Sequence, residues 1–239
     1  GPTPLRAYNR HLWVKDAFKR GDLLWRGWDL FEDYSGHLMT NWGAHSVDMI
    51  QFALGKDDTG PVQIDLKPEL LDSTVDDPWS DKTPPLGTVA DSKADRARFC
   101  PLVMSYADGT QVHFLPTVKA TVFYGEKGTL TLRRNDYSAK PRGLMPPPDA
   151  EQQGVWSGRG HVARPHLQNW LDAILSGSPV NAPPEVGHRS VTVCHLANLA
   201  RRLDRSLHWD PASERFVNDE DANAYLERPR RKGFELPTI

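Results

Sequence analysis

The chain has 239 residues, of which 38% are hydrophobic and 25% are charged, and its formal net charge at neutral pH is −2. Such a mixture is typical of a globular domain with a sizeable core and excludes an intrinsically disordered chain. Because the charge is close to zero, no basic field exists to attract nucleic acid or an anionic membrane, and we expect neither as a partner.

The first 55 residues predict an approach segment and then a helix. Residues 1–36 are rich in tryptophan and charge, and their first four residues do not have the pattern of a signal peptide. The pattern then changes to that of a helix over residues 41–54, which stops at Gly55, a common residue at helix ends. A short alternating run at residues 62–66 predicts a strand.

Residues 67–96 are rich in proline and aspartate and predict a long acidic loop. After this loop the chain alternates between β-rich runs and turns rich in glycine. Asp108-Gly109 between two such runs is a strong hairpin signal. The β-rich runs cover residues 99–106, 110–115, 120–124 and 129–133. Together with the strand before the loop, they predict an antiparallel sheet of about five strands.

A second irregular stretch, the proline-rich loop at residues 141–160, precedes two helices. Apolar residues recur at helical spacing over residues 165–175 and again over residues 185–203. A helix, then strands, then two helices predicts an α+β fold, with helices packed on one face of an open, mostly antiparallel sheet. We expect residues 1–239 to form a single substrate-binding and oligomerisation domain.

Cys100 and Cys194 are the two cysteines, 94 positions apart. Neither belongs to a Cys-x-x-Cys pair or to a Cys/His cluster with zinc spacing, so we expect two free buried thiols and no metal site. No stretch approaches the ~18 apolar residues of a membrane span.

The predicted first helix carries a polar stripe that could support chemistry. Asn41, His45, Asp48 and Phe52 stand at i, i+4, i+7 and i+11, so they share one helix face. Histidine is the natural proton carrier near neutral pH. The stripe is also compatible with an ordinary polar surface, or with a core histidine satisfied by Asp48.

Other patterns are weaker. Residues 158–163 have the spacing of a dinucleotide fingerprint, but a proline-rich loop precedes them, so we read the match as chance. Residues 187–190 could hold an anion or a sugar hydroxyl, or could simply pack at the start of a helix. Trp42 and Tyr34 suit stacking against a sugar ring, although aromatic residues near helices more often belong to a core.

Two adjoining runs, residues 31–36 and residues 41–55, resemble the Gfo/Idh/MocA oxidoreductase family, which includes glucose–fructose oxidoreductase and inositol dehydrogenase. Further stretches are similar to one bacterial branch of it, at residues 1–2, 8–9, 60–62, 166–172, 187–196, 209–211 and 215–216. The resemblance extends from the first residue to about residue 220.

The resemblance implies a parent with two domains, an amino-terminal Rossmann domain that binds NAD(P) and a carboxy-terminal domain with the sugar pocket. We expect this chain to hold the second domain without the Rossmann domain, and therefore to bind no cofactor by itself. His45 matches the family's proton acceptor and donor, whereas Asn41 replaces an aspartate. Candidate substrate-binding residues are Asp33, Tyr34, Trp42, Asp48, His188 and Arg189.

The resemblance also implies a homo-oligomer formed through the sheet, and leaves a cytoplasmic or an exported location open. The leading hypothesis is the substrate-binding portion of an NAD(P)-dependent oxidoreductase that acts on a sugar or cyclitol hydroxyl. A second hypothesis is a non-catalytic carbohydrate-binding or assembly module, because Asn41 cannot stabilise an imidazolium as a carboxylate does. The third is a cofactor-independent sugar lyase or hydrolase that uses His45 with Asp48 or Asp33.

Overall fold

The computed structural model describes residues 36–70, 100–115, 120–133, 136–145, 163–227 and 230–235. Most of the expected approach segment, and most of the two expected loops at 67–96 and 141–160, lie outside the described residues. The described parts of those loops contain two short 3-10 turns, η3 (Pro68–Leu70) and η4 (Arg142–Leu144).

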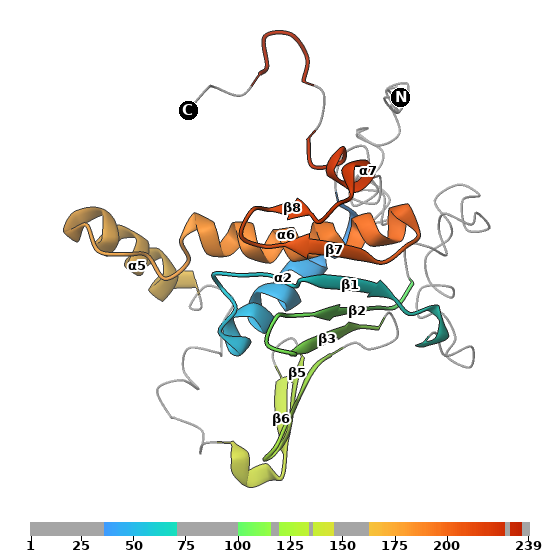
Figure 1. Cartoon of the computed structure of the whole chain (residues 1–239). Coiled ribbons are helices and arrows are strands. Elements are labelled where there is room, and N and C mark those ends of the chain that lie inside the picture. The colour runs from blue at the N-terminus through green and yellow to red at the C-terminus, as the bar shows by residue number, and fades with distance from the viewer. Residues whose placement is uncertain are drawn as a thin grey trace, which may run out of the picture.

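Four α-helices are described, in the order α2 (His37–Leu54), α5 (Ala163–Ser176), α6 (Pro184–Leu203) and α7 (Glu220–Asn223). The described strands are β1 (Gln63–Leu66), β2 (Leu102–Ser105), β3 (Gln111–Phe114), β4 (Thr121–Gly125), β5 (Gly128–Arg133), β6 (Asp136–Lys140), β7 (Leu207–Asp210) and β8 (Arg215–Phe216). Figure 1 shows their arrangement.

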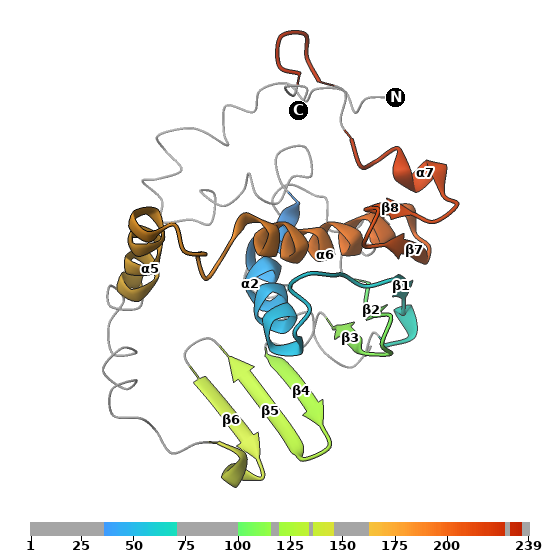
Figure 2. The same ribbon diagram turned by 60° about the vertical axis from the view of Figure 1, so that its left-hand side comes forward.

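The larger sheet has the strand order β3-β2-β1-β7-β8, and every neighbouring pair in it is antiparallel. Ile64 lies opposite both Met104 and Leu207, and all three side chains are at most 1% exposed. Side chains alternate between the two faces of a strand, so these residues mark the face that α2 and α6 cover (Figures 1 and 2). The predicted α+β fold with an open antiparallel sheet is confirmed.

The expectation of one sheet from five successive strands is wrong. Strands β4 and β5 pair with β6 in a separate three-stranded sheet, which lies beyond β3 on the side away from α6 (Figures 1 and 2). The turn between β4 and β5 occurs as predicted. It ends at Gly128, whose φ of 142° and close approach to the Lys140 carbonyl leave no room for a side chain.

Helix α2 begins at His37, four residues before the predicted start, and ends at Leu54 as predicted. Gly55 takes the left-handed conformation, with φ at 63°. The backbone N–H groups of Gly55 and Lys56 donate to the carbonyls of Phe52 and Gln51, which satisfies the last turn of the helix.

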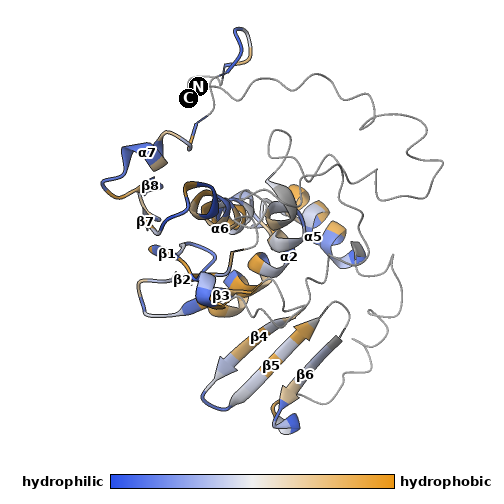
Figure 3. Cartoon of the chain, turned by 90° about the vertical axis from the view of Figure 1, so that its right-hand side faces the viewer, coloured by the Kyte–Doolittle hydropathy of each residue, from blue (hydrophilic) through white to orange (hydrophobic). Residues whose placement is uncertain are grey.

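Helix α5 exposes the apolar residues that its sequence pattern placed on one face. Leu167, Trp170 and Ile174 are each more than half exposed, and Ala173 is buried. Hydrophobic and hydrophilic stretches alternate along this helix in Figure 3. Unlike α2 and α6, α5 therefore leaves most of its apolar face uncovered by the described residues.

Both cysteines are free, as predicted. Cys194 on α6 is fully buried, and burial raises the pKa of its thiol to about 12. Cys100 is only partly buried, so the expectation of a second buried thiol is wrong in degree. Desolvation still raises the pKa of the Cys100 thiol, and the nearby Arg201 guanidinium opposes that rise.

A buried amide joins the end of α2 to the sheet. Gln51 is fully buried, and its Nε2 donates to the carbonyl oxygens of Lys56 at 2.9 Å and Thr59 at 3.1 Å. The hydroxyl of Tyr106 donates to Gln51 Oε1. Burial raises the pKa of Tyr106 well above its usual range, so the phenol keeps the proton that this hydrogen bond needs.

Replacing Gln51 with leucine is expected to lower the free energy of unfolding by about 2–4 kcal/mol, because the buried Tyr106 hydroxyl loses its acceptor and the part-buried Thr59 carbonyl loses its donor. Urea unfolding followed by circular dichroism measures the change. Gln168→Leu on the exposed surface of α5 is the matched control and should shift stability by less than about 0.5 kcal/mol. Equal losses in the two variants would contradict the structural role given to Gln51.

Iodoacetamide is expected to modify Cys100 well before Cys194, because only Cys100 is partly exposed. Because burial raises the pKa of the Cys100 thiol above its ordinary value, the labelling rate of Cys100 should still be rising with pH where the rate of a fully exposed thiol has levelled off. Mass spectrometry of the labelled peptides gives both rates, and unfolding the chain should make them similar. Fast labelling of Cys194 in the folded chain would show that α6 is not packed as described.

Candidate functional site

The predicted polar stripe lies on the exposed face of α2. Asn41, His45 and Asp48 are all exposed, whereas Val47 and Gln51, whose side chains point into the core, are at most 2% exposed. Asn41 and His45 stand one helical turn apart, which places their Cβ atoms about 5–6 Å from each other. The alternative of a core histidine is wrong, because the His45 side chain faces outward.

Trp42 lies beside this stripe. Its ring meets that of His45 edge-on, with the centroids 6.2 Å apart and the planes at 65°. The Trp42 side chain is 42% exposed, so part of its ring is open to a ligand. Trp209 on β7 is the contrasting case, since it is 4% exposed and packs on Phe216 in the core.

Asp48 is held by a residue on another helix. The hydroxyl of Ser190 on α6 donates to Asp48 Oδ1 at 2.8 Å, and Ser190 is itself 4% exposed. The sequence placed Ser190 in a run, residues 187–190, that could hold an anion or a sugar hydroxyl, but it did not predict the bond to Asp48. The available signal was a small polar residue on the buried face of α6, in step with Val193 and Ala197.

His188 and Arg189 face the hairpin of β7 and β8. His188 Nε2 lies 2.7 Å from Glu214 Oε1, and the Arg189 guanidinium lies 3.0 Å from the same carboxylate. Arg189 also donates to the carbonyl of Pro211 at 2.7 Å and pairs with Glu185 one turn earlier. These contacts fasten the start of α6 to the hairpin.

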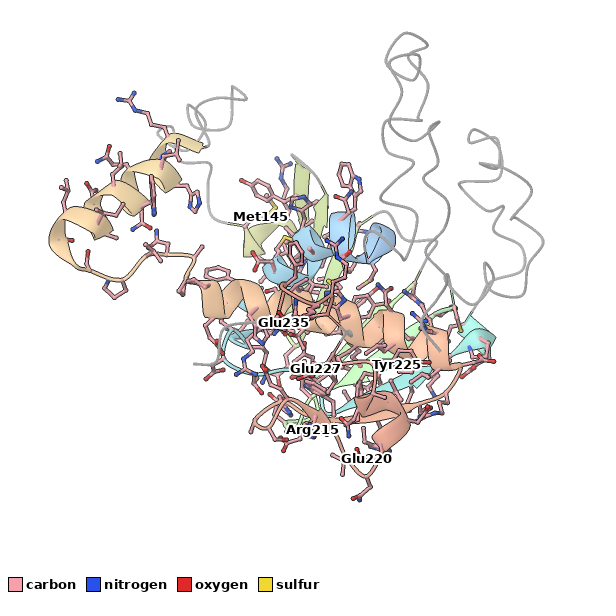
Figure 4. All side chains as sticks on the ribbon, turned by 90° about the horizontal axis from the view of Figure 1, so that it is seen from above. Met145, Arg215, Glu220, Tyr225, Glu227 and Glu235 are labelled. Atoms are coloured by element: carbon pink, nitrogen blue, oxygen red, sulfur yellow. The ribbon has the colours of Figure 1, made fainter. Side chains whose placement is uncertain are left out.

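The predicted site residues therefore form two groups. In Figure 4, Arg215 and Glu220, which follow Glu214 along the chain, lie across α6 from α2. Asn41, Trp42, His45 and Asp48 share the α2 face, whereas His188 and Arg189 bond to the hairpin. Asp33 and Tyr34 lie outside the described residues, so their part in the site stays a prediction.

A hollow of about 270 Å³ lies on the three-stranded sheet, away from these residues. Phe123, Leu130 and Ala139 are cross-strand neighbours on one face of the sheet, and with Leu144 of η4 they give the hollow apolar walls. None of its lining residues was predicted to bind substrate.

Within the described ranges, no three or more histidine, cysteine, aspartate or glutamate side chains come together as a metal site would require. No helix among those described is both long and apolar enough to cross a membrane.

A protein-family model described as the C-terminal α/β domain of an oxidoreductase family, Gfo/Idh/MocA, matches residues 1–81 and 162–236, more than half of the chain. The chain belongs to this family. The matched ranges of the Gfo/Idh/MocA domain hold all four α-helices described here, with β1, β7 and β8. No curated protein and no solved structure matches the chain.

Within this Gfo/Idh/MocA domain, Arg189→Ala is expected to lower the free energy of unfolding by about 1–3 kcal/mol, because a 17% exposed guanidinium that bonds a carbonyl and two carboxylates is lost. Arg189→Lys should recover only part of the loss, since an ammonium cannot repeat the planar fork. Thermal unfolding of both variants beside Arg215→Ala, whose ion pair is longer and more exposed, gives the comparison. Unchanged stability in Arg189→Ala would contradict the fastening role.

Proposed function

We propose that this domain is the substrate-binding portion of an NAD(P)-dependent oxidoreductase that acts on a hydroxyl group of a sugar or cyclitol. The observation that carries the proposal is the exposed stripe of α2, where an imidazole and an amide stand one turn apart beside a partly open indole. Imidazole and amide groups bond hydroxyls, and an aromatic face stacks on the apolar side of a sugar ring.

His45 would act on the proton of the substrate hydroxyl. When an alcohol is oxidised to a carbonyl, its oxygen must lose a proton as its carbon loses a hydride. A neutral imidazole nitrogen within hydrogen-bond reach of the hydroxyl accepts that proton, and histidine suits this role near neutral pH. The His45 side chain is exposed, so a ligand can approach its ring.

Asn41 would bind a substrate hydroxyl or orient the His45 ring, and it would carry no charge. Its amide can donate to one hydroxyl and accept from another, but it gains no charge to stabilise an imidazolium. The family resemblance sets an aspartate at this position, so a catalytic domain with Asn41 should be slower than one with the carboxylate.

NAD(P) does not fit the residues described. A dinucleotide lies in the crevice at the carboxyl ends of parallel strands, on a glycine-rich turn at a helix start. The described strands pair only in the antiparallel sense. We therefore propose that hydride acceptance, which is the chemistry NAD(P) supplies when bound, is provided by another domain or chain.

A second candidate function is a carbohydrate-binding or assembly module without catalysis, which the amide at position 41 favours.

We also propose, from the family resemblance, that the chain associates with copies of itself. Light scattering after size exclusion measures this, and a monomer at all concentrations would contradict it.

Isothermal titration calorimetry with a panel of monosaccharides and cyclitols tests the site. The native chain is expected to bind at least one of them, and His45→Gln to weaken that binding by about 2–10-fold through loss of one hydrogen bond. His166→Gln replaces another exposed histidine, on α5, and should leave affinity unchanged. Binding unaffected by His45→Gln, or absent across the panel, would sink the proposed site.

Turnover separates the two candidate functions. With a dinucleotide-binding domain of the same family and NAD(P) added, the oxidoreductase predicts measurable oxidation of the bound polyol, lowered about 10²–10⁴-fold by His45→Gln. Asn41→Asp should raise kcat if the domain is catalytic. A bound polyol that is never oxidised, even with Asn41→Asp, supports the binding module.

A further inference from the structure

Helix α6 contacts α2 at two polar points besides the apolar core between them. Near the start of α6, the Ser190 hydroxyl donates to Asp48 Oδ1 at 2.8 Å. Eight residues later, Asn198 Nδ2 donates to the backbone carbonyl of Gly36, directly before α2, at 2.6 Å. The two contacts are therefore about 12 Å apart along α6.

Apolar packing alone does not set the rotation of a helix finely, because the hydrophobic effect has no direction. A hydrogen bond does, since it weakens steeply away from its preferred distance and angle. The Gly36 bond restrains the first turn of α2 along its axis, and the Asp48 bond restrains rotation about the axis. His45 lies between these two points on the exposed face.

Ser190 also fixes the orientation of one side chain, that of Asp48. Asp48 is exposed and follows His45 by three residues, so its carboxylate borders the same patch of surface. Among the described residues, Ser190 is the hydrogen-bond partner of Asp48. A 4% exposed hydroxyl thus orients an exposed carboxylate, and leaves that carboxylate further lone pairs with which to accept a hydroxyl from a ligand.

We infer that Ser190 and Asn198 are positioning residues, which hold the Asn41–His45–Asp48 face of α2 in the orientation that binds a polyol, with Asp48 accepting one of its hydroxyls. This inference rests on the proposed function for its ligand. Helix α6 would then orient the site through two directional hydrogen bonds, in addition to burying one side of α2.

The test compares Ser190→Ala, Ser190→Cys and Asn198→Ala with a control that weakens the fold elsewhere. Asn223→Ala is suitable, because the Asn223 amide bonds the backbone of Phe216 in the C-terminal hairpin, away from α2. With the polyol that the native chain binds, the three α6 variants should lose about 5–20-fold in affinity. Asn223→Ala should lower the melting temperature and leave affinity within about twofold, and Ser190→Thr should recover most of the binding.

A second readout needs no ligand. The nuclear magnetic resonance signal of the His45 ring Cε1–H group should shift in Ser190→Ala and Asn198→Ala, and stay in place in Asn223→Ala. If the native chain binds no polyol, the proposed function fails and this signal alone decides the positioning role. A His45 signal and an affinity that do not respond to Ser190→Ala would overturn the inference.

Discussion

The packing of α2 on α6 and on the core shared with the sheet decides which way each candidate site side chain points. One side of α2 carries Val47 and Gln51 into the core, at 2% and 0% exposure, so the opposite side must face outward. His45 owes its accessibility to this division, since a rotation of the helix by about a third of a turn would bring its side chain to the place of Gln51 in the core. The chemistry proposed for His45 therefore depends on contacts made by residues that never meet a ligand.

A polar group in that core makes the arrangement specific. Gln51 could in principle be replaced by an apolar residue of similar size, but its amide satisfies two carbonyls of the loop after α2 and accepts from Tyr106. Because an unpaired amide inside the core is costly, any shift of α2 that breaks these bonds is disfavoured beyond the loss of apolar contact. The described residues thus restrain α2 at its end through Gln51 and along its length through Ser190.

Local patterns predicted the parts of the fold that local chemistry determines. The end of α2 at Gly55, the span of α6 and both hairpin turns follow from residue type and periodicity, and the structure has them. Strand β7 was missed because Leu207–Asp210 is short and is held by a bond from the Trp209 amide to Val62, far away in sequence. The same limit applies to the site, since Ser190 and Asp48 are 142 positions apart and no spacing rule links them.

The residues between the two ranges matched by the family model, 82–161, form part of the central sheet. Strands β2 and β3 belong to them, yet they complete the central sheet beside β1, and Met104 packs in the same core as Val47 of α2. The hydroxyl of Tyr106, the residue directly after β2, donates a hydrogen bond to Gln51 Oε1. A segment outside the family match is therefore bonded directly to the helix that carries His45. Because a change of register in β2 would move Tyr106 to the other face of the sheet, the orientation of α2 depends on both parts of the chain together.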